Sequence, residues 1–347
     1  MRRRARVALA GLGRMGRIHA GNLAGRCRSA ELACVLDVRP VVARAVGEEL
    51  GVPWSADVGS ALGDDRVDAL AVATDTGSHA ALVTAAAAAG TPVFCEKPIA
   101  LDRPSTVDAL DAVRKAGTLL QVGFHRRFDP DWAAAAARIA AGELGDVYLF
   151  RTSLRDMVPP DPRFLGGSGG FFVDMTIHDL DTARWLVGEV VELTAHGAAL
   201  SDPGFAEIGD VDTALVTLRF ASGALGVIDN SRAAGYGYEC STEVVGRAAS
   251  VRVDAPHRTG VEWRTAGASA RDLVADFEQR FPLAYAAEME AFARAVLDGT
   301  PPRVGGVDAL AAYDLARAAE RSWRAGRTVT LAVTVTADGA DYGSQED

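Results

Sequence analysis

Strand-like and helix-like stretches alternate along the chain from residue 6 to about residue 123. Short apolar strands are expected at Arg6–Ala10, Leu32–Leu36, Val67–Ala73, Thr91–Cys95 and Thr118–Gly123. Helices are expected between them at Arg14–Ala24, Ser78–Ala89 and Pro104–Ala116. Strands that alternate with helices of about 10–15 residues are typical of a parallel sheet with helices on both faces. The sequence therefore predicts an α/β domain with a doubly wound parallel sheet.

The pattern changes after about residue 126, where strands follow one another with few helices between them. Strands are expected at Val147–Arg155, Val190–Ala198, Val211–Phe220, Ala224–Arg232, Tyr238–Val245, Ser250–Val253 and Thr328–Leu331. Helices are expected at Asp131–Ala141, Val173–Val187, Leu283–Leu297 and Val307–Ala325. Consecutive strands joined by short turns favour antiparallel pairing. We expect a second, α+β domain with a large, open, mostly antiparallel sheet.

Composition sets the domain count and excludes several classes of partner. The chain has 347 residues, which suggests two domains, expected at residues 1–125 and 126–335, before a flexible tail at 337–347. The C-terminal helices are expected either to stay with the second domain or to pack back on the first domain. A net charge of −10 argues against binding to nucleic acid or to anionic membranes. Four cysteines without a CxxC pair predict a reducing, cytoplasmic location and no structural metal.

A glycine-rich motif follows the first predicted strand and opens a helix. Gly11-Leu12-Gly13-Arg14-Met15-Gly16 fits the pattern GxGxxG. In this pattern the first glycine allows a tight turn, the second lets a pyrophosphate approach, and the third lets the helix pack on the strand. Asp37 ends the second strand, where a carboxylate can accept hydrogen bonds from a ribose diol. The motif predicts a dinucleotide-binding site; a glycine-rich turn with a surface aspartate is the alternative.

The residues after the second strand bear on the choice of cofactor. The carboxylate of Asp37 would repel a 2′-phosphate, which favours NAD over NADP. Arg39, which follows Val38, is a group that can accommodate such a phosphate. NAD is therefore the expected cofactor, and NADP is not excluded.

A lysine lies at the end of the fourth predicted strand, in the segment Glu96-Lys97-Pro98. Ligands of open α/β sheets bind at the carboxyl ends of the strands, so Lys97 is expected to point towards the cofactor site. Lys97 and Lys115 are the only lysines of the chain. A lysine can lose its proton when it is partly desolvated, whereas an arginine cannot. Lys97 is a candidate catalytic residue; a salt-bridged surface lysine is the alternative.

Asp174 and His178 are four positions apart on a predicted helix. Side chains at this spacing lie on one face of an α-helix and can touch. A carboxylate beside an imidazole selects the tautomer of the ring and stabilises its protonated form. The pair is a candidate for acid–base catalysis, and an exposed pair without function is the alternative.

Taken together, these segments resemble the family of glucose–fructose oxidoreductase and inositol dehydrogenase. The motifs that carry the resemblance are Gly11–Gly16, Ala73-Thr74-Asp75-Thr76-Gly77-Ser78-His79, Glu96-Lys97-Pro98, and the helix from Gly169 to Asp181 with its D-x3-H-D-x-D pattern. The resemblance spans residues 6 to about 331. Asp75 is a departure, because the family usually has proline there.

Within this family the chain is most similar to the inositol 2-dehydrogenase group, through Gly123–Asp129 and Gly235–Glu239. The resemblance implies oxidation of a cyclic polyol with Lys97, Asp174 and His178 as catalytic residues. It also implies a dimer or tetramer joined through the C-terminal sheets. The expected cofactor contacts beyond the glycine motif are Asp37, Val38, Arg39, Ala73, Thr74, Asp75, His79, Glu96 and Lys97. The expected substrate contacts are Lys97, Arg127, Asp156, Asp174, His178, Tyr236 and Tyr238.

Two other functions stay open. A sugar dehydrogenase or keto-sugar reductase of the same family, including aminocyclitol or anhydrosugar metabolism, would use the same chemistry. A non-catalytic, NAD-binding sensor is less favoured, since the chain keeps Lys97, Asp174 and His178. The sequence has no Tyr-x3-Lys pair, no Cys/His zinc set and no P-loop, which excludes three other classes of nucleotide-dependent enzyme.

Overall fold

The computed structural model describes residues 3–160, 167–336 and 339–342 and divides the chain into two compact units. Unit 1 comprises Met1–Asp129 and Leu283–Leu310, and unit 2 comprises Pro130–Pro282 and Ala311–Asp347. The chain thus returns to unit 1 after unit 2 has begun, and the boundary between the units falls within the last long helix, α11 (Gly306–Ala325).

Unit 1 is built on a six-stranded sheet in which all strands run parallel, with the order β3-β2-β1-β4-β5-β6. The strands are β1 (Ala5–Ala10), β2 (Ala30–Leu36), β3 (Trp54–Ser55), β4 (Ala69–Val72), β5 (Val93–Glu96) and β6 (Leu120–Gly123). The predicted doubly wound sheet is confirmed. The order reverses between β1 and β4, and ligands of such sheets bind at the carboxyl ends of the strands beside this switch point.

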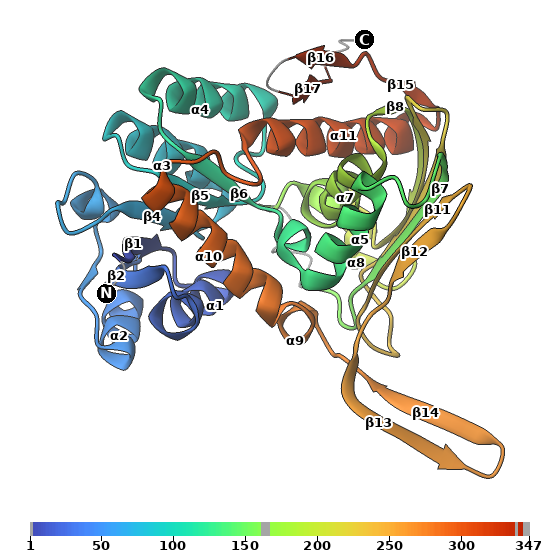
Figure 1. Ribbon diagram of the computed structural model, residues 1–347, viewed down its shortest axis with the longest axis horizontal. Coiled ribbons are helices and arrows are strands. Elements are labelled where there is room, and N and C mark those ends of the chain that lie inside the picture. The colour runs from blue at the N-terminus through green and yellow to red at the C-terminus, as the bar shows by residue number, and fades with distance from the viewer. Residues whose placement is uncertain (1–2, 161–166, 337–338, 343–347) are drawn as a thin grey trace. The chain divides into compact units, whose positions relative to one another are not determined.

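Helices cover both faces of this sheet, as Figure 1 shows, with α1 and α2 on one side and α3 and α4 on the other. Their bounds are α1 (Arg14–Gly21), α2 (Pro40–Leu50), α3 (Thr76–Ala88) and α4 (Arg103–Ala116). A π-helical turn, η1 (Asn22–Arg26), continues α1. The later helix α10 (Pro282–Asp298) also belongs to unit 1, because it buries Met289, Phe292 and Ala293 in the core that Leu9 and Phe94 share.

Unit 2 contains a seven-stranded sheet with the order β12-β11-β7-β10-β9-β8-β15. The strands are β7 (Val147–Arg155), β8 (Val190–Ala198), β9 (Thr213–Phe220), β10 (Leu225–Ser231), β11 (Glu239–Gly246), β12 (Ser250–Val253) and β15 (Val329–Thr330). All neighbouring strands are antiparallel except β7 and β10, which are parallel. The predicted mostly antiparallel sheet is therefore confirmed, with one parallel pair inside it.

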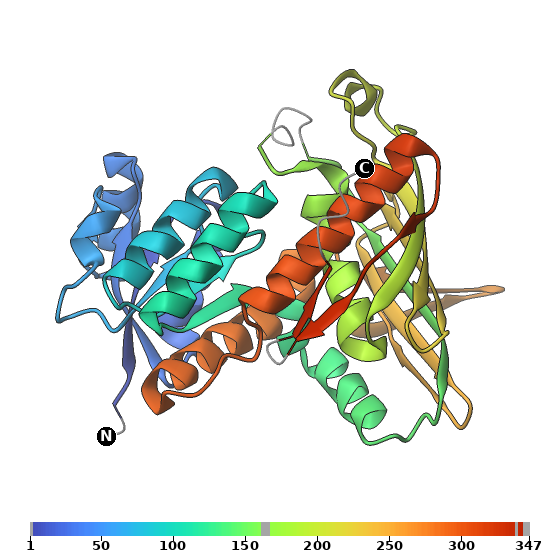
Figure 2. The ribbon, with the colours of Figure 1, turned by 90° about the horizontal axis from the view of Figure 1, so that it is seen from above.

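Helices of unit 2 lie on one face of its sheet and leave the other face open (Figure 2). They are α5 (Pro130–Ala140), α7 (Ile177–Val187) and α11. Unit 2 also contains the short helices α8 (Gly204–Glu207) and α9 (Phe277–Arg280). Buried and exposed residues alternate along β9, as expected for a sheet with one covered face. Among the described residues, no helix combines the length and the apolar character that crossing a lipid bilayer requires.

Three parts of unit 2 differ from the expected elements. The predicted helix over Val173–Val187 begins with a π-helical turn, η4 (Phe172–Thr176). A separate hairpin of β13 (His257–Thr265) and β14 (Ala268–Leu273) was not expected. In the tail, which was expected to be flexible, β17 (Gly339–Asp341) pairs with β16 (Thr334–Thr336). The hydroxyl of the buried Tyr342 donates to Glu189. Residues 337–338 and 343–347 of this tail lie outside the described residues.

Candidate active site

The turn after β1 has the geometry to receive a phosphate group. Gly11 has a φ of +88°, and a Cβ on it would lie 2.4 Å from the carbonyl oxygen of Ala73. A Cβ on Gly16 would lie 1.9 Å from the carbonyl oxygen of Gly11, whereas a Cβ on Gly13 would meet nothing within 4 Å. The first and third glycines thus allow close packing, and the second leaves open space at the N-cap of α1, where an anion is favoured.

Asp37, directly after β2, is held by the glycine turn and by Arg39. Its carboxylate accepts a hydrogen bond from the backbone N–H of Leu12 at 3.0 Å. It also accepts from the backbone N–H, Nε and Nη2 of Arg39 at 3.0, 2.9 and 2.9 Å. The guanidinium of Arg39, followed by these backbone bonds, lowers the pKa of Asp37 to about 2 against the effect of burial. The Arg39 guanidinium is therefore engaged by Asp37, which favours a ribose diol over a 2′-phosphate, while Val38 between them is exposed.

His79 on α3 links two loops at the carboxyl edge of the sheet. Its Nδ1 lies 2.9 Å from the carbonyl oxygen of Pro98, and its Nε2 lies 3.1 Å from that of Thr74. Both partners are acceptors, and a neutral ring can donate to only one of them. His79 is buried, and its two ring nitrogens hold the loop after β4 in place. Its contact with a cofactor stays a prediction.

Asp75 occupies the N-cap position of α3 with a φ of −68° and a ψ of 145°. A proline has nearly the same φ. The backbone at residue 75 therefore has a conformation that a proline at this position would also adopt.

Lys97 directly follows β5 and precedes a cis peptide bond to Pro98. The preceding residue, Glu96, is largely buried, and its Oε1 lies 2.7 Å from Nε2 of His19 on α1. Gly123 on β6 makes room for this carboxylate, because a Cβ there would lie 2.8 Å from Oε2 of Glu96. Three elements of unit 1 thus meet at the strand end that carries Lys97.

In unit 2, Asp174 lies in the π-helical turn η4 and His178 in the first turn of α7. The carboxylate of Asp174 forms an ion pair with Nη2 of Arg232 at 2.9 Å. Arg232 is almost fully buried, and its guanidinium lies over the ring of Phe171 at 5.4 Å. The expected contact between Asp174 and His178 assumed a regular α-helix, so with the π-turn it stays a prediction.

Buried hydrogen bonds hold α7 against the sheet of unit 2. Asp179, next to His178, is fully buried. It accepts from Thr152 Oγ1 of β7 at 3.0 Å and from Asn230 Nδ2 of β10 at 2.9 Å. Within α7, Thr182 Oγ1 donates to the carbonyl oxygen of His178 at 2.7 Å. The backbone that carries His178 is therefore positioned by side chains of two strands.

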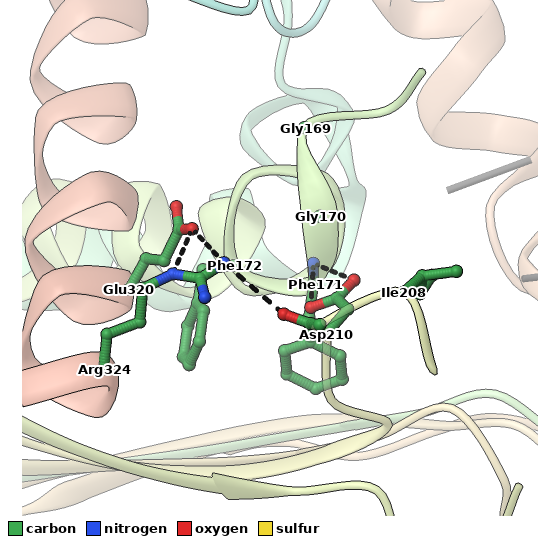
Figure 3. Close-up of a pocket in the computed structure, with 9 residues that line it drawn as sticks. Gly169, Gly170, Phe171, Phe172, Ile208, Asp210, Glu320 and Arg324 are labelled. Carbon is green, nitrogen blue, oxygen red and sulfur yellow. Dashed lines mark hydrogen bonds and ion pairs between the residues drawn. The ribbon is translucent and has the colours of Figure 1, made fainter. Parts of the chain in front are cut away.

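A cavity of about 190 Å³ adjoins the N-terminal end of the π-turn η4 (Figure 3). It is lined by Gly169–Phe172, Ile208–Asp210, Glu320 and Arg324. Both carboxylate oxygens of Asp210 accept from the backbone N–H of Phe171, at 3.0 and 3.2 Å, while burial raises the pKa of Asp210. Arg324 pairs with Glu320 at 3.0 Å. Asp210 thus completes the N-terminal end of the segment that carries Asp174.

The four remaining substrate candidates have different surroundings. Arg127 is buried in unit 1, where Nη2 lies 3.0 Å from Oδ1 of Asp308. Tyr238 is buried and its ring packs against Phe281, which favours a packing role. Tyr236 is exposed, and its hydroxyl donates to Glu239 at 2.5 Å. Asp156 directly follows β7 and donates its backbone N–H to the carbonyl oxygen of Ser231. Their contact with a substrate stays a prediction.

Sequence reasoning missed Arg232, Asp210 and the role of Asp179 as an anchor. Asp179 lies within the quoted helix motif, so its position was available but its partners were not. Arg232 is the last residue of a predicted strand and directly follows the observed strand β10, so its position at a strand end resembles the signal that selected Lys97 in unit 1. Asp210 carries no comparable signal, because it precedes a strand in a loop.

Known proteins share this architecture along nearly the whole chain. Residues 5–124 match the domain described as "Oxidoreductase family, NAD-binding Rossmann fold", and residues 132–252 match the "GFO/IDH/MocA C-terminal domain". The chain is 38% identical over 335 residues to scyllo-inositol 2-dehydrogenase (NAD(+)) of Bacillus subtilis, covering 96% of this chain and 98% of that relative. The chain belongs to the GFO/IDH/MocA oxidoreductase family.

Two further relatives resemble this oxidoreductase over nearly its whole length. The chain is 40% identical over 329 residues to myo-inositol 2-dehydrogenase of Thermotoga maritima, covering 94% of this chain and 98% of that relative. The crystal structure of scyllo-inositol dehydrogenase from Lactobacillus casei with bound NAD(H) and scyllo-inositol superposes with a TM-score of 0.89 at 27% identity, covering 94% of this chain and 99% of that chain. Similarity therefore extends over both units.

The Asp37–Arg39 pair generates a prediction about cofactor choice. In Asp37→Ser the Arg39 guanidinium loses its carboxylate, so it becomes available to a 2′-phosphate. We expect the ratio of kcat/KM for NADP to that for NAD to rise by about 10–100-fold, since hydrogen bonds to charged groups contribute about 1.5–3 kcal/mol. Steady-state kinetics with both cofactors measure this ratio.

The matched control is Asp64→Ser. Asp64 binds Arg66 through the same backbone N–H, Nε and Nη2 contacts, at 2.8, 3.0 and 2.7 Å. Unlike Asp37, Asp64 does not follow the carboxyl end of a strand at the expected cofactor site. Its cofactor ratio should equal that of the wild type. An unchanged ratio in Asp37→Ser would show that the pair does not select the cofactor.

The anchor of α7 generates a prediction about stability. Asp179→Ala leaves the buried amide donor of Asn230 without its acceptor, while Thr152 Oγ1 keeps the carbonyl oxygen of Ser241 at 2.9 Å. We therefore expect the free energy of unfolding to fall by about 1–3 kcal/mol. Asp179→Asn keeps an acceptor for Thr152, and a flipped Asn230 amide can pair with the new Nδ2, because Oδ1 of Asn230 has no partner among the described residues. Chemical denaturation should therefore rank Asn between wild type and Ala; equal values for all three would contradict the anchor.

Proposed function

We propose that this protein is an NAD-dependent dehydrogenase that oxidises a secondary hydroxyl of a cyclic polyol, an inositol or an inositol derivative, to a keto group. The observation that carries the proposal is the position of Lys97 at the carboxyl end of β5, in the same sheet as the open glycine turn. The relatives named scyllo-inositol 2-dehydrogenase (NAD(+)) and myo-inositol 2-dehydrogenase support this substrate class.

The residues of unit 1 fit the cofactor that the family description names. Gly13 leaves the space that a pyrophosphate needs, Gly11 and Gly16 allow the close packing that forms the turn, and the N-terminus of α1 favours the negative charge. Asp37 is the acceptor for the adenosine ribose. Thr74, Asp75, Glu96 and Lys97 border the same carboxyl edge of the sheet. NAD, when bound, supplies the acceptor for the hydride.

Oxidation of an alcohol removes a hydride from carbon and a proton from oxygen, so the protein must receive that proton. His178 or Lys97 accepts it, and the other donates a hydrogen bond that stabilises the developing negative charge on oxygen. Asp174, paired with Arg232, presents a carboxylate from the turn that precedes His178. Asp179 positions the backbone of His178 through its two buried bonds.

Two parts of the proposal concern the protein's setting. The open face of the unit 2 sheet, with exposed Leu215 and Leu225, is the surface through which we expect a homodimer or homotetramer to form. A cytoplasmic location rests on the cysteine pattern of the sequence. Both stay predictions.

A substrate panel tests the activity. Purified protein is incubated with NAD and myo-inositol, scyllo-inositol, other inositols, or aldose sugars, and NADH is followed by absorbance. We expect turnover with at least one inositol at a higher kcat/KM than with any sugar. Preference for a sugar would favour the sugar dehydrogenase, and NAD binding without turnover of any polyol would favour the sensor.

Lysine replacement tests the site. In Lys97→Ala we expect kcat to fall by about 10²–10⁴ while the Kd for NAD stays nearly unchanged, because a positioned acid or base contributes that factor to the chemical step. Lys115→Ala is the matched control, since Lys115 is the other lysine of the chain and lies exposed near the end of α4. Near wild-type turnover in Lys97→Ala would remove Lys97 from the mechanism.

A further inference from the structure

Three ionisable side chains meet inside unit 1 around the residue that precedes Lys97. They are His19 of α1, Glu96 at the end of β5, and Glu288 of α10. One potential ligand atom from each lies within 4.8 Å of the others. His19 and Glu288 are fully buried, and the Glu96 side chain is 13% exposed.

The hydrogen bond within this cluster joins only two of the three described side chains, His19 and Glu96. Nε2 of His19 lies 2.7 Å from Oε1 of Glu96. Among the described residues, neither carboxylate oxygen of Glu288 has a hydrogen-bond partner. Gln121 of β6 donates to the backbone carbonyl of Glu288 at 3.0 Å, which anchors the helix but not the carboxyl group. An ionised, unpaired carboxylate at this depth and beside another carboxylate would be strongly unfavourable.

We propose that Glu288 carries a proton in the folded enzyme. The pair of Glu96 and Glu288 then has a single negative charge, which lies on Glu96 and is stabilised there by the hydrogen bond with His19. Burial, and then the charge of Glu96, raise the pKa of Glu288 well above its ordinary value, in agreement with this geometry.

The other ionisable groups of this region do not change the argument. Tyr285, on the same helix, has its pKa raised chiefly by burial, so it is a neutral neighbour. Arg14 and Arg126 lie close enough to influence Tyr285, and the ring of His125 lies 4.9 Å from its ring. Among the described residues, none of these groups forms an ion pair or hydrogen bond with the carboxyl group of Glu288.

A divalent cation is the competing occupant, because a histidine and two glutamates can ligate one. The hydrogen bond between His19 and Glu96 already joins two of the three ligand atoms. A metal site also needs an entry path, and the side chains of His19 and Glu288 are closed to solvent. The proton is therefore the occupant that this geometry favours.

The proton has a consequence for Lys97 that rests on the proposed function. A neutral Glu288 packs beside Glu96 without repelling it, so the end of β5 stays in place. Glu288 is then a positioning residue for Lys97. Glu288→Gln, which is neutral and of the same shape, should keep the wild-type kcat, whereas Glu288→Ala should lower kcat by about tenfold or more through displacement of the strand end.

The decisive measurement is the pH dependence of stability, which needs no substrate. The unfolded chain loses the proton of Glu288 above about pH 4.3, whereas the folded chain keeps it. The folded state then binds one more proton, so stability falls as the pH rises towards the pKa of the folded state. Relative to Glu288→Gln, the folding equilibrium constant of the wild type should fall by about tenfold per pH unit in that window.

Glu290→Gln is the matched control on the same helix. Burial alone would raise the pKa of Glu290, but hydrogen bonds from Ser29, Arg294 and Arg28 lower it overall. Its contribution to stability is present above its unfolded pKa and is lost as the pH falls. The wild type should therefore gain stability relative to Glu290→Gln as the pH rises, with the opposite sign to the Glu288 variant.

Infrared spectroscopy and metal analysis complete the test. The folded wild type at neutral pH should show the carbonyl stretch of a buried carboxylic acid, and Glu288→Gln should lack it. Parallel stability curves for wild type and Glu288→Gln, failure of Glu288→Gln to fold, or stoichiometric metal in the purified protein would each overturn the proposal. These readouts are independent of whether any polyol is oxidised, so they distinguish this inference from the proposed function.

Discussion

The carbonyl oxygen of Gly11 occupies the space that a side chain at residue 16 would need, and this close packing sets the direction of α1. Because α1 begins at Arg14, its N-terminus faces the open space beside Gly13. The same helix brings His19 to within 2.7 Å of Glu96, at the end of the strand that carries Lys97. One contact between two glycines therefore determines both the anion-binding end of the helix and the surroundings of the lysine.

In unit 2, contacts of charged side chains position the catalytic candidates, whereas in unit 1 close backbone packing positions them. The helix that carries Asp174 and His178 begins with a π-turn, and such turns are rare and occur frequently at functional sites. Arg232 holds Asp174, Asp210 holds the start of the turn, and Asp179 ties the following helix to two strands. The bonds of Asp179 are buried and the other two contacts are partly buried, so the loss of one partner would leave a polar group without its partner away from bulk water.

The fold could be predicted where the hydrophobic pattern has one clear period. The alternation of strands and helices predicted the parallel sheet, and the run of strands after residue 126 predicted the second one. The helix Pro40–Leu50 was missed although it begins with proline and ends at Gly51 with a φ of +68°, both of which are recognised boundary signals. The hairpin His257–Leu273 was missed for a physical reason: its residues are mostly exposed, so no buried face imposes an alternating pattern on them.

The candidate site could be predicted only as far as residues that are neighbours in the sequence. The glycine motif and the Glu96-Lys97-Pro98 segment are local, and the structure places them on the elements that were expected. The partners that control their charge are remote: Asp174 and Arg232 are 58 positions apart, and His19 and Glu96 are 77 positions apart. A buried charge is stable only beside its partner, and that partner is chosen by strand order and helix packing. A sequence motif can therefore identify a chemically active side chain before anything is known of the fold, but its protonation state follows from the tertiary structure.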